Sequence, residues 1–260
     1  MPYRAHAKVN SFLKIVGTRG SYHELYSRFL RVNSLFDTLK FVPKQSKAPF
    51  ELVGDFECSV EQNTLYKAFI YLQEEGFEKE VCAFMHEHAL EVKKVIPIGA
   101  GLGGGSSDAA TFLLMLNEKA ALGLTCEDLM RIGAKVGADV PFFVSGYQSA
   151  NVRGIGEIVE PFEEECLEVE VVTPSLFCNT ALVYKTYREY FMQTMKHDEA
   201  TEMLGMKSDK LIEIFSRVDL NDLFLPALKA YPRLKEFAKE GWCFSGSGSS
   251  FFKLVEKKNG

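Results

Sequence analysis

A glycine-rich stretch followed by polar residues is the part of this sequence that most directly suggests chemistry. Four glycines lie within the segment 101–105, and Ser106, Ser107 and Asp108 follow directly. Glycine inside an element weakens it by roughly 0.5–1 kcal/mol, so the stretch needs a role that side chains would obstruct. Bare backbone N–H groups at 103–105, beside the unpaired N–H groups and positive dipole end of a helix, bind anions such as phosphate. We therefore predict a phosphate site, in which the serine hydroxyls bond phosphate or the water shell of Mg²⁺ while Asp108 caps the helix.

Three other interpretations of this stretch compete with an anion site. Gly99, Gly101 and Gly104 satisfy the dinucleotide-binding pattern G-x-G-x-x-G, but that pattern needs a second strand ending in an acidic residue about 20 residues further on. The segment 117–129 is helical in character instead. A P-loop requires a lysine after the glycines, and none follows. The last interpretation is a loose surface loop before an ordinary capped helix, which the density of glycines disfavours.

A lysine and an aspartate far apart in the sequence are candidates for proton chemistry. Lys8 and Asn10 lie two residues apart in an otherwise apolar run, so both side chains point to the same face of a strand. Asp139 lies between small and bulky apolar residues in the segment 137–143, and a buried carboxylate is costly unless it is paired. The plain alternatives are a solvated lysine at a strand edge and an aspartate that caps a turn or helix. The chemical alternative is a catalytic pair of Lys8 and Asp139.

The elements that would position these residues are mixed strands and helices. Helical spacing of apolar residues predicts a helix over 63–77, with Asn63 as its N-cap. The other predicted helices are 106–122, 127–136, 181–192, 209–218 and 234–239. The predicted strands are 7–16, 23–42, 89–96, 141–144, 148–152 and 169–172, and two further strands flank a glycine turn near the end of the sequence. Strands followed by helices indicate an α+β chain with two lobes, and the shift in composition places a boundary near 150–160.

Composition narrows the class of protein. The 260 residues are 47% hydrophobic and carry a formal net charge of −5, which disfavours a nucleic-acid-binding protein. The six cysteines are scattered and form no C-x-x-C pair, so neither a zinc site nor a disulfide framework is expected, and free thiols fit a reducing cytoplasm. The first residues lack the apolar core of a signal peptide, and no apolar run reaches the roughly 20 residues of a membrane span.

The glycine stretch and two other segments carry a resemblance to a known family. The sequence PIGAGLGGGSSDAA, residues 97–110, resembles the phosphate loop of the GHMP small-molecule kinases. The segments AKVN around Lys8, YHEL from Tyr22, and GADVPFF around Asp139 are similar to those of one branch, the diphosphocytidyl-methylerythritol kinases. The resemblance implies an α+β, two-lobed GHMP kinase fold. Its lobes would be an N-terminal α/β ATP-binding domain, 1–155, and a C-terminal ferredoxin-like domain, 156–260, with the active site in the cleft between them.

The same resemblance assigns roles to individual residues. Lys8 and Asp139 become the catalytic pair, and ATP with Mg²⁺ becomes the cofactor. The residues implied to bind ATP are Pro97, Ile98, Gly99, Ala100, Gly101, Leu102, Gly103, Gly104, Gly105, Ser106 and Ser107, with Asn63 and Lys94 near the adenine. The residues implied to bind substrate are Asn10, Tyr22, His23, Thr180 and Tyr184. Tyr22, His23 and Tyr184 would contact a cytosine and Thr180 the methylerythritol end, and the glycine turn at 245–250 would lie near the phosphates. Gly20–Ser21 departs from the family's Asp-Gly, which affects the predicted contact with cytidine. No metal ligand is assigned.

The resemblance implies transfer of the ATP γ-phosphate to the 2-hydroxyl of a cytidine-diphosphate-linked methylerythritol, a precursor in non-mevalonate isoprenoid biosynthesis. The expected partner is this small molecule, with no nucleic acid and no membrane, and the oligomeric state is not predicted. Two alternatives stay open. One is a GHMP kinase acting on homoserine or mevalonate, and the other is a nucleotide-binding regulator without catalysis.

Overall fold

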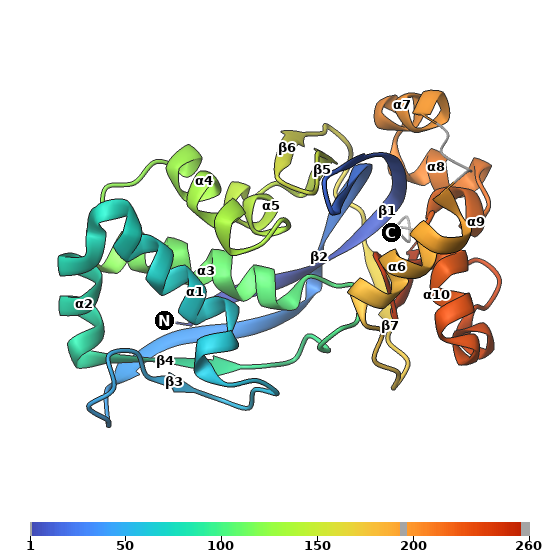
Figure 1. The fold of residues 1–260 in the computed structure, drawn as a ribbon. Coiled ribbons are helices and arrows are strands. Elements are labelled where there is room, and N and C mark those ends of the chain that lie inside the picture. Colours follow the sequence, from blue (N-terminus) through green and yellow to red (C-terminus); the bar gives the residue numbers. More distant parts are fainter. Residues whose placement is uncertain (1, 193–196, 256–260) are drawn as a thin grey trace, which may run out of the picture. The chain divides into compact units, whose positions relative to one another are not determined.

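The protein is α+β, with two separate β-sheets (Figure 1). The computed structural model describes residues 2–192 and 197–255. The chain forms two compact units, each assembled from separated stretches. Unit 1 comprises Met1–Ala7, Leu35–Ile96 and Gly104–Gly146, and unit 2 comprises Lys8–Ser34, Pro97–Gly103 and Tyr147–Gly260. The family resemblance implied two domains that meet between residues 155 and 156. This domain boundary stays a prediction.

Two long strands, β1 (Tyr3–Arg19) and β2 (Tyr22–Pro43), contribute residues to both units. In unit 1, β2 pairs antiparallel with β4 (His88–Lys93), so that Thr38 lies opposite Lys93. The short strand β3 (Leu52–Val53) pairs in parallel with β4. The helices of unit 1 are α1 (Thr64–Leu72), α2 (Glu78–Glu87), α3 (Gly104–Lys119), α4 (Cys126–Val136) and α5 (Val140–Ser145).

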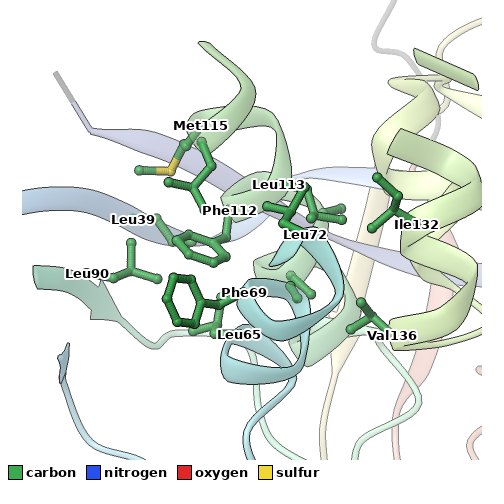
Figure 2. Close-up of a cluster of buried hydrophobic side chains, with 14 of the residues drawn as sticks. Leu39, Leu65, Phe69, Leu72, Leu90, Phe112, Leu113, Met115, Ile132 and Val136 are labelled. Carbon is green, nitrogen blue, oxygen red and sulfur yellow. The ribbon is translucent and has the colours of Figure 1, made fainter. Parts of the chain in front are cut away.

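The core of unit 1 forms where these helices pack on the strands. Figure 2 shows Leu39 of β2 and Leu90 of β4 beside Phe69 of α1 and Phe112 of α3, and all four are buried. The apolar residues of α1 recur at helical spacing and are buried along one face, which is the pattern of an amphipathic helix. Burial of a large apolar side chain contributes roughly 1.5–3 kcal/mol, so this cluster fixes α3, whose N-terminus follows the glycine stretch.

Unit 2 contains the other part of the large sheet and all of the small one. β5 (Ser149–Arg153) pairs with β2 over Ser27–Leu30 and with β6 (Ile158–Pro161). The second sheet has the order β7–β9–β8 and consists of β7 (Val169–Val172), β8 (Cys243–Phe244) and β9 (Phe251–Leu254). The helices of unit 2 are α6 (Thr180–Tyr190), α7 (His197–Gly205), α8 (Ser208–Ile214), α9 (Arg217–Leu220) and α10 (Phe224–Ala230). A second cluster of buried side chains, among them Val183, Phe224 and Phe244, forms the core of this unit.

Several sequence predictions need correction. The predicted strand at 141–144 is helix α5, because the chain turns at Asp139 and Pro141 occupies the first turn, where proline is tolerated. A short apolar run does not distinguish a strand from a helix by periodicity. The helix expected over 63–77 changes to a π-turn at Gln73–Phe77, where Gly76 has a φ of 98°.

Other predicted helices differ from the structure in type or extent. The helix predicted at 209–218 is divided between α8 and α9, and that at 234–239 is a 3-10 helix over Pro232–Phe237. Helices α2, α7 and α10 were not predicted. Within residues 2–192 and 197–255, no helix combines the length and the apolar character that a membrane span requires.

Candidate active site

The glycine stretch begins in unit 2 as a loop held by a second loop. Gly99, Gly101 and Gly103 all have positive φ, between 63° and 75°, a conformation that favours glycine. A side chain at Gly101 would overlap the carbonyl oxygen of Ser245. The Ser245 hydroxyl donates to the Gly101 carbonyl at 3.1 Å, and the Ser250 amide donates to the Ala100 carbonyl at 3.1 Å. The segments 97–103 and 245–250 therefore support each other through backbone groups.

The stretch continues in unit 1 as the start of α3. The helix begins at Gly104, and Ser107 and Asp108 are buried within its first two turns. The Thr64 hydroxyl, at the start of α1, donates to the Gly105 carbonyl at 2.9 Å. The first N–H groups of a 16-residue helix have no intrahelical partner and favour an anion. The predicted helix start is confirmed to within two residues, whereas phosphate binding stays a prediction.

The predicted ATP-binding residues differ in exposure. Ala100, Leu102 and Ser107 are buried, while Pro97, Ile98 and Gly105 are exposed and Gly99, Gly101, Gly103, Gly104 and Ser106 are half-buried. Buried Asn63 caps α1, since its side-chain oxygen accepts the Leu65 amide at 3.0 Å. This cap confirms the predicted N-cap at Asn63, but a contact of Asn63 with adenine stays a prediction.

Lys94 lies between two acidic side chains within unit 1. Its amine is ion-paired with Asp37 and, at 2.6 Å, with Asp108. Burial lowers the pKa of Lys94, but the two carboxylates outweigh this effect and leave the pKa above its ordinary value. Burial raises the pKa of Asp108 to about 7, against the opposing effect of Lys94. One cation thus serves two buried acids.

Lys8 occupies a buried position in unit 2. Its amine donates to the side-chain oxygen of Asn10 at 2.8 Å and lies 4.4 Å from the centre of the Phe29 ring. The Asn10 amide donates to the Ser27 hydroxyl at 2.9 Å. The Lys8 backbone amide donates to the Leu102 carbonyl at 3.0 Å. The predicted placement of Lys8 and Asn10 on one strand face is therefore observed, and the Lys8 backbone pairs with the glycine loop.

Asp139 belongs to unit 1 and stands immediately before α5. It is half-buried, and the Val140 amide after it donates to the Gly137 carbonyl at 3.1 Å. Gly137 also lies close to α3, because a side chain at 137 would be 3.6 Å from the Ser106 hydroxyl. The turn thus places Asp139 near the start of α3 within the same unit. The pairing of Asp139 with Lys8 stays a prediction.

Three aromatic rings gather in unit 2, where β2 begins beside α6. The His23 ring centre lies 5.1 Å from that of Tyr184 and 5.7 Å from that of Tyr187. Burial, aided by the positive charge of Arg188, lowers the pKa of His23 and so favours the neutral imidazole. Its buried Nε2 has no hydrogen-bond partner among the described residues. Tyr22 is 62% exposed. A neutral imidazole beside aromatic faces suits recognition of a planar heterocycle.

Thr180, predicted to contact substrate, begins α6. Its hydroxyl is hydrogen-bonded to that of Ser247 at 2.8 Å, which links the start of α6 to the loop 245–250. The preceding Phe177 lies against Gly99, where a side chain would overlap its ring. Lys8, the glycine loop, Thr180 and the aromatic cluster are therefore connected within unit 2.

Comparison with known proteins decides the family. Residues 63–147 match the GHMP kinases N terminal domain. A 4-diphosphocytidyl-2-C-methyl-D-erythritol kinase of Sulfurimonas denitrificans is 54% identical over 260 residues, covering 99% of this chain and 98% of the relative. The chain belongs to the 4-diphosphocytidyl-2-C-methyl-D-erythritol kinase family. Another relative with this name, from Helicobacter pylori, is 40% identical and covers 99% of this chain, which covers 96% of that relative.

Solved structures agree with this family. A crystal structure of 4-(cytidine 5'-diphospho)-2C-methyl-D-erythritol kinase is 33% identical and superposes with a TM-score of 0.73, covering 98% of this chain and 90% of its own. A mevalonate kinase is 15% identical with a TM-score of 0.61, covering 99% of this chain and 92% of its own, and it supports the fold alone. The predicted α+β class and GHMP kinase fold are confirmed.

Several residues around these sites were missed from the sequence. Tyr187, Ser27 and Phe29 contact predicted site residues. The spacing of Tyr187, three residues after Tyr184, is a helical signal that could have identified it. Asp37 carries no local signal, because its partner Lys94 is 57 residues away.

Proposed function

We propose that this chain transfers the γ-phosphoryl group of ATP to the 2-hydroxyl of 4-diphosphocytidyl-2-C-methyl-D-erythritol. The observation that carries the proposal is 54% identity over 99% of the chain to a relative with that kinase's name. The products are the 2-phosphate and ADP. The substrate is a small molecule, and the free thiols at all six cysteines support a reducing, cytoplasmic location.

In the proposed reaction, the substrate oxygen forms a bond to the γ-phosphorus while the bond from that phosphorus to the β–γ bridging oxygen breaks. Phosphoryl transfer has a loose transition state, so positioning and charge stabilisation carry most of the catalysis. Asp139 accepts the hydroxyl proton late in the transfer. Lys8 orients the hydroxyl and stabilises the negative charge that develops during the transfer. The hydrogen bond from Lys8 to Asn10 supports this role, since it restricts the flexible amine.

The ATP phosphates bind the glycine loop and the N-terminus of α3. Because the glycines have no side chains, a phosphate can approach their backbone N–H groups closely. The positive end of the helix dipole also stabilises its negative charge. Mg²⁺ prefers hard oxygen ligands and usually reaches a site together with substrate phosphates. The Ser106 and Ser107 hydroxyls at the start of α3 fit this donor type. When bound, Mg²⁺ would neutralise part of the negative charge of the phosphates.

The cytosine of the substrate binds beside His23, with Tyr22 and Tyr184 as stacking rings. Stacking of a base on an aromatic ring contributes about 1–3 kcal/mol. The unsatisfied Nε2 of His23 supports this assignment, because a buried polar atom without a partner is costly until a ligand supplies one.

An ADP-release assay with the purified protein, ATP and Mg²⁺ tests the function. We expect turnover with 4-diphosphocytidyl-2-C-methyl-D-erythritol and none with homoserine or mevalonate. Turnover with homoserine or mevalonate alone would replace the proposed substrate. Tight ATP binding without turnover on any of the three would instead indicate a nucleotide-binding regulator.

A further inference from the structure

One buried ionic cluster within unit 1 connects the residues before the glycine loop to the helix after it. Asp37 on β2, Lys94 after β4, and Asp108 on α3 form this cluster. The Lys94 amine is ion-paired with Asp37 and with Asp108, the latter at 2.6 Å. Asp37 is fully buried and Asp108 is 3% exposed. The two buried acids share one half-buried cation.

Asp37 fixes the backbone that leads into the loop. One of its carboxylate oxygens accepts the amides of Val95 and Ile96, at 2.5 Å and 2.8 Å. Its other oxygen accepts the Lys94 amine. Three consecutive residues are therefore held by a single carboxylate. Because hydrogen bonds to an ionised group are stronger than neutral ones, the segment 94–96 has little freedom.

Asp108 fixes the helix that leaves the loop. Its Oδ2 accepts the Lys94 amine, whereas its buried Oδ1 has no hydrogen-bond partner in the described residues. The helix start also packs directly on the incoming backbone. A side chain at Gly104 would be 2.9 Å from the Ile96 side chain and 3.6 Å from the Lys94 amine. The segments 94–96 and 104–108 are thus joined by both charge and packing.

We propose that Asp37, Lys94 and Asp108 form a brace that sets the separation of the two ends of the phosphate loop, and that they are positioning residues for ATP. The proposal rests on the phosphate site of the proposed function. It departs from the placement of Lys94 near the adenine, because the brace acts on the backbone around the phosphates. Preorganised N–H groups bind charge strongly because they need no rearrangement when the ligand arrives.

Stability alone does not explain the brace. Replacing a buried ion cluster with well-packed apolar residues is often neutral or stabilising, whereas removing one partner is strongly destabilising. A purely structural contact between β2, β4 and α3 could therefore use apolar side chains. Charged groups at this place instead fix one geometry, and that geometry lies where the phosphate loop begins and ends.

Three substitutions and one matched control test the brace. Lys94→Met removes the cation, Asp108→Ala removes the tie to α3, and Asp108→Asn keeps an oxygen that accepts the Lys94 amine. The control is Lys14→Met in unit 2, where Lys14 is 4% exposed and ion-paired with Asp222 at 2.5 Å. This control also breaks a buried lysine–aspartate pair, but Lys14 belongs to neither the brace nor the phosphate loop.

The readouts are the dissociation constant of ATP–Mg²⁺ by titration calorimetry, the Tm, and the kinetic constants. We expect Lys94→Met and Asp108→Ala to raise the dissociation constant and the KM for ATP by roughly tenfold, with a smaller change in kcat. Asp108→Asn should retain most of the affinity. Lys14→Met should lower the Tm but leave ATP binding near that of the wild type.

Asp108→Ala decides the outcome, because direct contact of Lys94 with the nucleotide would also weaken binding in Lys94→Met. Wild-type ATP affinity in Asp108→Ala, or an equal loss in Lys14→Met, would overturn the brace. If Lys94→Met does not fold, the ATP affinity of the two Asp108 variants relative to the wild type still tests the proposal. Failure of the wild type to phosphorylate the cytidyl substrate would reject the proposed function instead, and calorimetry reports on ATP binding independently of it.

Discussion

The start of α3 in unit 1, proposed to bind phosphate, and the region around Lys8 and His23 in unit 2, proposed to bind substrate, differ in their chemistry. Around the start of α3, one lysine is held between two buried carboxylates. Around Lys8 and His23, the contacts include a neutral amide, a hydroxyl and aromatic rings. In the first arrangement a carboxylate holds backbone amides and an amine, while the second brings neutral polar atoms and aromatic rings together.

The difference matches the chemistry of the two proposed ligands. A triphosphate is recognised by backbone N–H dipoles whose positive ends point toward it. The groups that hold this backbone in place should therefore be rigid. A cytosine is recognised by its flat faces and by the hydrogen-bonding atoms at its edge. A neutral histidine serves such an edge better than a charged one, because either ring nitrogen can donate or accept. Substitutions on the two sides should therefore affect different kinetic constants.

The largest expected effect is on turnover. Asp139→Ala should lower kcat by about 10²–10⁴-fold, the usual contribution of a positioned general base. The dissociation constant of ATP should change by less than about twofold, because the phosphate-binding amides are unaltered. Single-turnover kinetics and calorimetry measure the two quantities. A near-normal kcat in this variant would remove Asp139 from the mechanism.

Next in size is a change to the loop itself. Gly101→Ala adds a methyl group at a φ of 75° and against the Ser245 carbonyl. We expect a loss of roughly 2–4 kcal/mol in the free energy of unfolding, with weaker ATP binding. Gly123→Ala is the matched control, since Gly123 has a φ of 70° but nothing within 4 Å of an added Cβ. Equal losses in the two variants, by chemical denaturation, would show that strain alone matters and that the loops do not interlock.

A smaller effect is expected on the substrate side. Tyr184→Ala should raise the KM for the cytidyl substrate by about 5–150-fold, which corresponds to the 1–3 kcal/mol of one base–aromatic stack. Tyr184→Phe keeps the ring and should stay within about threefold of the wild type. The KM for ATP should not change in either variant. If Tyr184→Phe is as impaired as Tyr184→Ala, stacking is not the role of this residue.

The smallest expected effect concerns the charge of Asp108 and is an effect on stability. Burial raises its folded pKa to about 7, whereas an unfolded aspartate titrates near 3.9. The folded state therefore binds the extra proton, so Asp108 lowers the stability of the protein as pH rises from about 4 to about 7.

Asp108→Asn should remove this contribution, so its Tm relative to the wild type should be higher at pH 8 than at pH 5. Thermal unfolding at both pH values measures the effect. A difference of the opposite sign would mean that ionised Asp108 stabilises the fold.

Local signals in the sequence predicted part of this architecture. Glycines before Ser106 predicted a turn and a helix start, and Asn63 predicted a helix cap, because these residue types act on their own backbone. The apolar run at 141–144 was assigned to a strand, since four residues carry no distinguishing period. The helix in its place depends on the turn at Asp139.

Contacts between distant residues could not be predicted from such signals. Asp37 holds Lys94 and the two following amides, yet nothing near Asp37 in the sequence indicates a partner after β4. The ring of Tyr187 meets His23 only because α6 packs beside the start of β2. The roles of Lys8 and Asp139 came from the family resemblance. Their residue types alone fitted either a catalytic pair or a solvated lysine and a capping aspartate.

The mutual support of segments 97–103 and 245–250 has a consequence for biosynthesis. The Ala100 carbonyl receives its hydrogen bond from Ser250, which the ribosome adds long after the glycines. A nascent polypeptide that ends before Ser250 lacks this support. Catalytic competence should therefore arise only after Ser250 has been added, and products that terminate before it should phosphorylate no substrate.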